Sequence, residues 1–301
     1  MKTRKGIILA GGTGTRLAPL TTAVSKQLLP VYDKPLIYYP ISTLMLAGIR
    51  EILIITTPNE NAQFRQLLGD GALWGVTFEF AEQQEPRGLA DAFIVGEEFL
   101  DGHPSVLILG DNIHFGSGLP DMLQRANSST DATLFVSHVP DPHRFGIAEI
   151  GKDGGILSIE EKPAKPKSNL AITGLYFLNE DAPRYAHEIT PSARGELEIV
   201  SVLEMYLKRG TLKSQIMSRG FAWLDAGTHE SLHHAGNFVQ TIQERQGLLI
   251  ASPEEVAYRQ GFITLDEFEA TCEPVEKSSY GELLVALVQD LRGRETARGT
   301  G

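Results

Sequence analysis

The sequence predicts an α/β fold of the Rossmann-like type, a doubly wound mixed sheet with a helical layer at its C-terminal end. Two patterns indicate this fold. Apolar, strand-like runs alternate with amphipathic, helix-like segments through the first third of the chain, and after residue 228 the sequence becomes mostly helical. The chain has 301 residues, 42% of them hydrophobic, which is enough for one large core or two fused lobes.

The alternation begins close to the N-terminus. Expected strands cover residues 6–10, 51–57, 76–81 and 105–109, and expected helices cover residues 60–68 and 89–99. Because several of these strand-like runs are apolar throughout, we expect parallel strands with helices on both faces of the sheet.

The pattern then changes to shorter strands and finally to helices. Expected strands cover residues 133–139, 146–150, 156–160 and 171–178, and this half should extend the sheet and cover a pocket. A helix is expected from Thr228 to Gln246, and apolar residues at helical spacing return before residue 291. We therefore divide the chain into a core at 1–227, a helical region at 228–291 and a disordered tail at 292–301.

Composition excludes several classes of protein. No run approaches the ~18 apolar residues of a membrane span, and the single Cys272 excludes a disulfide framework within the chain. His114 and His138 occur without a metal-binding spacing, so packing or surface roles are expected for them. The net charge of −11 argues against a nucleic-acid-binding surface. With no signal peptide recognisable, we expect a cytoplasmic protein that binds neither nucleic acid nor membrane.

The most informative segment is a glycine-rich loop that directly follows the first strand. Residues 9–17 read Leu-Ala-Gly-Gly-Thr-Gly-Thr-Arg-Leu, and glycines in this place let backbone N–H groups approach phosphate oxygens closely. Arg16 adds a permanently charged guanidinium for the same anion. A dinucleotide fingerprint would need a glycine at position 17, where Leu17 stands, and the Gly-Lys-Ser/Thr of a P-loop is missing. A plain turn between strand and helix is the alternative interpretation.

Charged residues suited to phosphate chemistry lie near this loop and at two later positions. The first 34 residues carry six Lys or Arg side chains, Lys26 among them, against Asp33 alone. Asp111 follows a strand at the sheet edge where open α/β folds bind ligands, and Asp225 precedes a helix; either could instead cap a loop or helix. With no Ser–His or Cys–His arrangement, these residues indicate phosphoryl-type transfer with Mg²⁺ held by carboxylates.

Longer motifs identify a family. From about Lys5 to Leu291 the sequence is similar to the glucose-1-phosphate thymidylyltransferases, which belong to the sugar nucleotidyltransferases. The likeness is carried by the glycine loop and by Ser-Lys-Gln-Leu-Leu-Pro-Val at 25–31, Asp-Lys-Pro at 33–35, Pro-Arg-Gly-Leu-Ala at 86–90 after Gln83, Gly-Asp-Asn at 110–112, Glu-Glu-Lys-Pro at 160–163, Thr-Gly-Leu-Tyr at 173–176 and Arg-Gly-Glu-Leu-Glu-Ile at 194–199. The run after Lys26 favours thymidylyl over uridylyl transfer, because uridylyl enzymes are expected to differ there.

The resemblance implies a reaction. A phosphate oxygen of glucose 1-phosphate attacks the α-phosphorus of dTTP in line, and pyrophosphate leaves to give dTDP-glucose, the first step toward dTDP-L-rhamnose or a related deoxysugar. It also implies the nucleotidyltransferase fold, with a nucleotide-binding part over about residues 1–130 and a sugar-phosphate-binding part over about residues 131–227.

The resemblance also assigns roles to individual residues. Arg16 and Lys26 are implied as catalytic cations, and Asp111 and Asp225 as the Mg²⁺ ligands. The implied nucleotide-binding residues are Leu9, Gly11, Gly12, Gly14, Thr15, Gln27, Gln83, Pro86, Gly88 and Asn112. The implied sugar-phosphate-binding residues are Gly146, Glu161, Lys162, Ile172 and Trp223, although core packing accounts equally well for the tryptophan.

A regulatory site and an assembly are implied in the C-terminal part. Arg219, Glu255, Val256 and Arg259 match a site near a subunit contact at which dTDP-L-rhamnose inhibits, whereas Leu249 stands where a lysine is expected. The loss of that charge predicts weaker inhibition. The resemblance alone implies a homotetramer.

Two other functions stay open at the level of sequence. One is a nucleotidyltransferase that uses UTP or another sugar phosphate, since uracil shares the imide edge of thymine. The other is a non-catalytic regulator that binds nucleotide sugars. That second function would require the loss of catalytic charge, and Arg16, Lys26, Asp111, Lys162 and Asp225 are all present.

Overall fold

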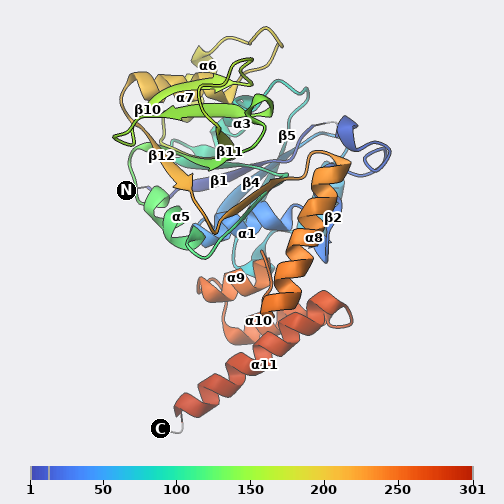
Figure 1. Ribbon diagram of the computed structural model, residues 1–301. Coiled ribbons are helices and arrows are strands. Elements are labelled where there is room, and N and C mark those ends of the chain that lie inside the picture. The colour runs from blue at the N-terminus through green and yellow to red at the C-terminus, as the bar shows by residue number, and fades with distance from the viewer. Residues whose placement is uncertain (1, 13, 300–301) are drawn as a thin grey trace.

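A mixed β-sheet lies at the centre of the computed structural model, which describes residues 2–12 and 14–299. Within this range the sheet has nine strands in the order β10-β9-β11-β6-β1-β4-β5, with β8 paired to β11 and β12 paired to β8. Helices cover both faces of the sheet and form a further layer at the C-terminal end (Figure 1). The predicted fold class is confirmed.

The N-terminal half of the sheet is parallel. Its strands are β1 (Lys5–Leu9), β4 (Glu51–Thr56), β5 (Thr77–Glu82) and β6 (Ser105–Leu109), paired in the order β6-β1-β4-β5. Neighbouring residues of β1 point to opposite faces of the sheet: Ile8 packs with the helices of one face and Ile7 with those of the other. The apolar runs of β1, β4 and β6 are therefore buried on both sides, as a parallel sheet requires, whereas β5 at the sheet edge is partly exposed.

The other half of the sheet is mostly antiparallel. Its strands are β8 (Ala132–His138), β9 (Gly146–Ile150), β10 (Ile156–Glu161), β11 (Leu170–Leu178) and β12 (Leu212–Met217). Strand β11 joins the halves, because it pairs antiparallel with β6, β8 and β9. Its register shifts between Ile172 and Tyr176, where Gly174 has a φ of +71°, and this irregularity turns the middle of β11 toward the pocket described below.

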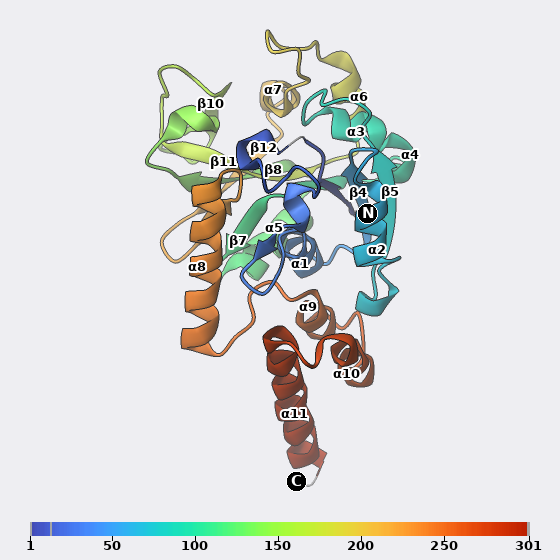
Figure 2. The same ribbon diagram turned by 90° about the vertical axis from the view of Figure 1, so that its right-hand side faces the viewer.

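Helices surround the sheet as a doubly wound fold requires. One face is covered by α1 (Tyr38–Leu46), α2 (Asn61–Leu68) and α5 (Leu119–Asn127), and the other by α3 (Asp91–Val95), α4 (Glu97–Leu100), α6 (Ala182–Glu188) and α7 (Ile199–Lys208). Figure 2 shows α3, α6 and α7 on the side of the sheet opposite α1 and α5. The single helix predicted over residues 89–99 is wrong, because Gly96 separates α3 from α4 and Gly88, with a φ of +110°, delays the helix start.

Two small sheets outside the central one were not predicted. Strand β7 (Asn112–Phe115) pairs antiparallel with β13 (Ala222–Asp225), and β2 (Pro30–Val31) pairs with β3 (Lys34–Pro35). The β7–β13 pair joins segments more than a hundred residues apart and places Asp225 opposite Asn112. It is therefore the element that brings the two predicted metal ligands into one site.

The C-terminal layer contains α8 (His229–Gln246), α9 (Pro253–Arg259), α10 (Leu265–Cys272) and α11 (Ser279–Gly299). Helix α8 begins after Thr228, as predicted. The disordered tail predicted from Arg292 is wrong over residues 292–299, since α11 continues through them and leads away from the body (Figure 1). The Arg292 guanidinium lies 2.5 Å from the carboxylates of Asp266 and Glu269 on α10, which favours the helical state; residues 300–301 lie outside the described range. No helix in the described part of the chain is long and apolar enough to span a membrane.

Candidate active site

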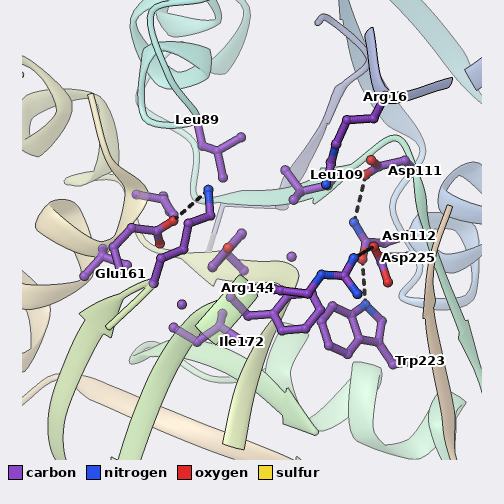
Figure 3. Close-up of a pocket in the computed structure, with 17 residues that line it drawn as sticks. Arg16, Leu89, Leu109, Asp111, Asn112, Arg144, Glu161, Ile172, Trp223 and Asp225 are labelled. Atoms are coloured by element: carbon purple, nitrogen blue, oxygen red, sulfur yellow. Dashed lines mark hydrogen bonds and ion pairs between the residues drawn. The ribbon is translucent and has the colours of Figure 1, made fainter. Parts of the chain in front are cut away.

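A cavity of about 260 Å³ opens at the carboxyl ends of β1 and β6. This is the edge at which open α/β sheets bind ligands. The predicted site residues that line it are Arg16, Asp111, Asn112, Gly146, Glu161, Lys162, Ile172, Trp223 and Asp225 (Figure 3). They come from segments spread over two hundred residues and comprise Arg16, the two predicted metal ligands, all predicted sugar-phosphate-binding residues, and Asn112 from the nucleotide set.

The glycine loop presents Arg16 to this cavity. Gly12 and Gly14 have φ values of +112° and +57°, conformations that favour glycine, and Gly14 precedes the short 3₁₀ helix η1 (Thr15–Leu17). Thr13 lies outside the described residues. The Arg16 guanidinium has no hydrogen bond or ion pair with any residue that the structure describes, and a Cβ atom at Gly227 would lie only 2.9 Å from its Nη2. The loop thus holds an unpaired cation at the cavity edge, with room made for it by Gly227.

Lys26 reaches the site through a second short helix, η2 (Lys26–Leu28). Its Nζ lies 2.5 Å from Oδ2 of Asp111, and the two side chains are each 16% exposed. The neighbouring Gln27 is buried, and its side-chain oxygen accepts a hydrogen bond from Ser25 Oγ at 2.7 Å. The predicted catalytic lysine is therefore in direct contact with a predicted metal ligand. The Gln27 side chain is instead held within its own segment by the hydrogen bond from Ser25.

A chain of hydrogen bonds orients the first carboxylate. Asn112 Nδ2 donates to Asp111 Oδ1 at 3.0 Å, and Trp223 Nε1 donates to Asn112 Oδ1 at 2.6 Å. The backbone N–H of Ala226 donates to the Asp111 carbonyl at 3.0 Å, next to Asp225. Trp223 thus lines the cavity and also packs partly against the core, so packing accounts for part of its position and its sugar-binding role stays a prediction.

The second carboxylate faces a cation that sequence reasoning missed. Asp225 Oδ2 lies 3.3 Å from Arg144 Nη2, and the Arg144 guanidinium lies 5.3 Å from the ring centroid of Phe145 (Figure 3). Phe145 in turn makes an edge-to-face contact with Trp223, the ring centroids being 5.1 Å apart. Arg144 stands in a short connection before β9 with no distinctive motif around it, so the sequence carries no clear signal for it.

The two carboxylates are suited to a hard divalent cation. Oxygen ligands are what Mg²⁺ prefers, and Mg²⁺ commonly takes one or two protein carboxylates and completes its shell with substrate phosphates and water. Among the residues described, no cluster of three or more His, Cys, Asp or Glu side chains could hold a metal by itself. A site with Asp111 and Asp225 alone therefore fits a cation that binds together with a nucleotide.

The far side of the cavity is built around Glu161. Its Oε1 lies 3.5 Å from Lys162 Nζ and 3.3 Å from Arg194 Nη2. Gly146 lies beside it, because a Cβ there would approach Glu161 Oε2 to 3.2 Å. Lys162 has a φ of +42°, which is unfavourable for a residue with a Cβ, and its N–H donates to the Phe145 carbonyl at 3.1 Å. The structure thus holds Lys162 in a strained conformation at the place where a sugar phosphate was expected.

The predicted base-binding residues form a neighbouring group beyond this cavity. Gln83 is buried at the end of β5, and its Oε1 faces Gly11, where a Cβ would lie 3.3 Å away. The loop that follows is anchored to Leu197: a Cβ at Gly88 would lie 2.5 Å from its carbonyl oxygen, and Ala90 N–H donates to the same oxygen. Leu89 of this loop lines the cavity. The members of the predicted nucleotide set that do not line the cavity are Leu9, Gly11, Gly12, Gly14, Thr15, Gln27, Gln83, Pro86 and Gly88.

Burial shifts the pKa of two side chains at or near the cavity. Burial lowers the pKa of His114, on β7 below Trp223, to about 4, so this imidazole is neutral at physiological pH. Burial also raises the pKa of Tyr176, which lines the cavity, so its hydroxyl stays protonated. Neither residue was in the predicted site; the motif at 173–176 carried a signal for the tyrosine, and His114 was expected to pack, as it does.

The predicted regulatory residues lie away from the cavity. Glu255, Val256 and Arg259 are on α9, where Arg259 Nε lies 2.6 Å from Glu255 Oε1 and Val256 is buried. Arg219 is exposed in the turn before β13, and no hydrogen bond or ion pair joins it to α9 within the described range. Leu249 packs partly against the main core. One helix therefore carries three of the four residues.

Comparisons with known proteins find relatives over nearly the whole chain. The model of the nucleotidyl transferase family matches residues 5–242. A glucose-1-phosphate thymidylyltransferase of Xanthomonas campestris pv. campestris (strain B100) is 55% identical over 290 residues, covering 96% of this chain and 98% of the relative. One of Neisseria gonorrhoeae is 55% identical over 285 residues, covering 94% and 99%. A crystal structure of UDP-glucose pyrophosphorylase with UDP-glucose superposes on 79% of this chain and 99% of its own, at 25% identity and a TM-score of 0.71.

Proposed function

Since this chain belongs to the nucleotidyl transferase family, and within it to the glucose-1-phosphate thymidylyltransferases, we propose that it transfers a thymidylyl group from dTTP to glucose 1-phosphate. The products are dTDP-glucose and pyrophosphate. The observation that carries the proposal is the cavity itself, which gathers Arg16, Asp111, Lys162 and Asp225 from four distant segments.

The protein has little covalent chemistry to do in such a transfer. A phosphate oxygen of the sugar phosphate attacks the α-phosphorus in line, the bond to the pyrophosphate oxygen breaks, and positioning with charge stabilisation supplies the catalysis. Arg16 is free of partners among the described residues, so it can meet the developing negative charge without first leaving a carboxylate. Lys162, held beside Glu161, would orient the attacking phosphate.

We assign the metal to Asp111 and Asp225 and identify it as Mg²⁺. When bound there, Mg²⁺ neutralises nucleotide phosphate charge and orients the phosphates. Lys26 and Arg144, which contact these carboxylates here, would then be available to phosphate oxygens. That each carboxylate faces a cation shows how the chain balances two negative charges in one cavity.

The base would be held by Gln83 and the loop through Pro86 and Gly88, with Leu9 and Gly11 beneath it. The sugar hydroxyls would contact Glu161, Gly146 and Ile172 beside Trp223. This division supports dTTP, because the base group is separate from the charged cavity and ends in an amide suited to an imide edge. Uracil shares that edge, so UTP use is the alternative that the assay below must measure. A non-catalytic regulator is disfavoured because Arg16, Lys162 and the two carboxylates share one cavity and Lys26 contacts Asp111.

Pyrophosphate release tests the proposal directly. The protein is assayed with glucose 1-phosphate and Mg²⁺ against dTTP, UTP, ATP, CTP and GTP in parallel, with an EDTA control. EDTA-sensitive turnover led by dTTP is expected. Turnover led by UTP would favour the uridylyl alternative, and no turnover across a panel of sugar 1-phosphates would favour a non-catalytic binding protein.

We further propose, from the family resemblance, a homotetramer inhibited by dTDP-L-rhamnose at Arg219, Glu255, Val256 and Arg259. Light scattering tests the assembly. Leu249 offers no charge to an inhibitor phosphate, so weak inhibition is expected, and Leu249→Lys should strengthen it. An inhibition curve that Leu249→Lys leaves unchanged would contradict this role for position 249.

A further inference from the structure

We propose that Asp91 is a specificity-determining residue: it holds the side-chain amide of Gln83 so that only the carbonyl oxygen of that amide faces the bound base. Asp91 does not touch substrate and acts as a positioning residue. The inference rests on the proposed function, because it assigns the base subsite to Gln83.

The contact between the two residues is direct and buried. Gln83 Nε2 donates to Asp91 Oδ2 at 2.8 Å, and Asp91 is only 2% exposed. The same nitrogen donates to the carbonyl oxygen of Gly88 at 3.3 Å. Both N–H bonds of the amide are therefore committed to the protein, and a base can meet only Oε1.

The orientation of this amide follows from the chemistry of its neighbours. A backbone carbonyl can only accept a hydrogen bond, and a carboxylate oxygen accepts as well, so the NH₂ end must face Gly88 and Asp91. Oε1 is thereby turned toward Gly11 of the glycine loop, where a Cβ would lie 3.3 Å from it. The base subsite thus presents a fixed acceptor.

A fixed acceptor selects among bases. Thymine and uracil carry an N–H donor at ring position 3, which can donate to Oε1, whereas cytosine has an acceptor there. Two acceptors facing each other in a buried site leave both unsatisfied, which disfavours the wrong base strongly. Asp91 therefore selects the class of base with a ring N–H donor and does not discriminate thymine from uracil.

The position of Asp91 is not explained by helix stabilisation. An acid in the first turn of a helix is often favourable, but α3 is only five residues long, and the hydrogen bond of Asp91 goes to Gln83. Its second oxygen, Oδ1, has no hydrogen-bond partner among the described residues, and the nearest cation is Arg87, whose Nη1 lies 3.7 Å away and whose side chain is 57% exposed. A buried carboxylate this poorly satisfied costs stability, so packing alone does not account for it.

The test compares Asp91→Leu with Asp91→Asn. Leucine removes the acceptor, whereas asparagine keeps an oxygen that can accept from Gln83 Nε2. For each protein, kcat/KM is measured with glucose 1-phosphate and dTTP, dUTP or dCTP. We expect the preference for dTTP over dCTP to fall at least tenfold in Asp91→Leu and to stay within about threefold of wild type in Asp91→Asn. The preference for dTTP over dUTP should be unchanged in both, because both bases carry the donor.

These ratios separate a positioning role from a structural one. A general loss of folding lowers all three activities together and moves neither ratio, and thermal melting is recorded for each variant. If Asp91→Leu does not fold, the smaller Asp91→Ala carries the same prediction. A dTTP:dCTP ratio unchanged in a folded variant without the acceptor would overturn the inference, as would a wild type that uses dCTP as well as dTTP. A wild type inactive with dTTP would instead overturn the proposed function.

Discussion

The rim and the floor of the cavity hold their polar groups in different ways. The rim consists of Arg144 and Lys162 with their carboxylate partners, of Arg194 next to Glu161, and of Arg16, which has no partner among the described residues; the first three side chains are 41–48% exposed. We use the word floor for the buried polar side chains that lie at or next to the cavity, of which Asn112 lines it; they are Gln83, Asp91, Asn112 and His114, all at most 7% exposed. Exposed ion pairs are concentrated in the rim, whereas the floor holds buried polar groups, among them the hydrogen-bonded Gln83, Asp91 and Asn112.

This difference separates catalysis from selection. Exposed ion pairs contribute little to folding, so the rim cations can leave their carboxylates for phosphate oxygens at small cost. The buried bonds of the floor cannot be exchanged so easily, because an unpaired buried group is costly. Substitutions in the rim should therefore change rates while stability is kept, and substitutions in the floor should change stability or base preference.

The largest expected effect is in the rim, at Arg16. We predict that Arg16→Ala lowers kcat/KM roughly 150-fold, which corresponds to a loss of about 3 kcal/mol of transition-state stabilisation, because the change removes a cation placed where charge develops. The midpoint of thermal unfolding should hardly move, since the guanidinium has no partner among the described residues. Arg184→Ala, an exposed arginine on α6 away from the cavity, serves as the control. A kcat/KM for Arg16→Ala within threefold of wild type would refute the role.

The next effect is a pH dependence of stability that originates in the floor. The pKa of His114 is about 4 in the folded protein and 6.5 ordinarily, so the unfolded chain takes up the proton first as the pH falls. The contribution of neutral His114 to the free energy of unfolding is complete above pH 6.5 and is lost as the pH falls toward 4. Lowering the pH from 7.5 to 5.5 should remove about 1.3 kcal/mol of the free energy of unfolding, which urea denaturation at both values measures.

His114→Phe isolates this contribution. Phenylalanine fills similar space and does not titrate. Neither ring nitrogen of His114 makes a well-formed hydrogen bond with a described residue, and the variant loses only a weak contact with the Thr173 backbone that opposes the pKa shift. The variant should lose about 1.3 kcal/mol less than wild type over the same pH step. Equal losses in the two proteins would show that His114 already titrates normally in the folded state.

A smaller effect on stability is expected at Thr228, which follows the rim carboxylate Asp225 and caps the first helix of the C-terminal layer. Thr228 caps α8 three residues after Asp225, and its Oγ1 accepts from Ser231 N–H at 3.2 Å. Thr228→Ala should cost about 1 kcal/mol of unfolding free energy. Thr264→Ala is the matched control, because Thr264 caps α10 in the same way and lies away from the cavity. Both substitutions should lower the free energy of unfolding by a similar amount, and only Thr228→Ala should also raise KM. KM changes of the same size in both variants would refute a link between the Thr228 cap and the site.

The sequence predicted the parts of the site that local patterns encode. The glycine loop, Arg16, and Asp111 at a strand end are adjacent to a recognisable element, and the eight expected strands lie within a few residues of observed ones, although β12 of the central sheet was not expected. The β7–β13 pair could not be predicted in this way, because it depends on contacts between segments a hundred residues apart. Arg144 and the hydrogen bond from Gln83 to Asp91 are likewise set by tertiary packing, and the helical end of the chain is favoured by Arg292 meeting α10.

The smallest effect returns to the rim and tests whether its cations are exchangeable. Arg144 lies 3.3 Å from Asp225 and competes there with a divalent cation for the same oxygen. Because an exposed ion pair is worth at most about 1 kcal/mol, we predict that Arg144→Gln tightens Mn²⁺ binding about threefold in the absence of nucleotide, measured by electron paramagnetic resonance. Arg144→Lys keeps the charge and should behave like wild type. Weaker Mn²⁺ binding in Arg144→Gln would show that the arginine positions Asp225 for the metal, and the rim would then be as fixed as the floor.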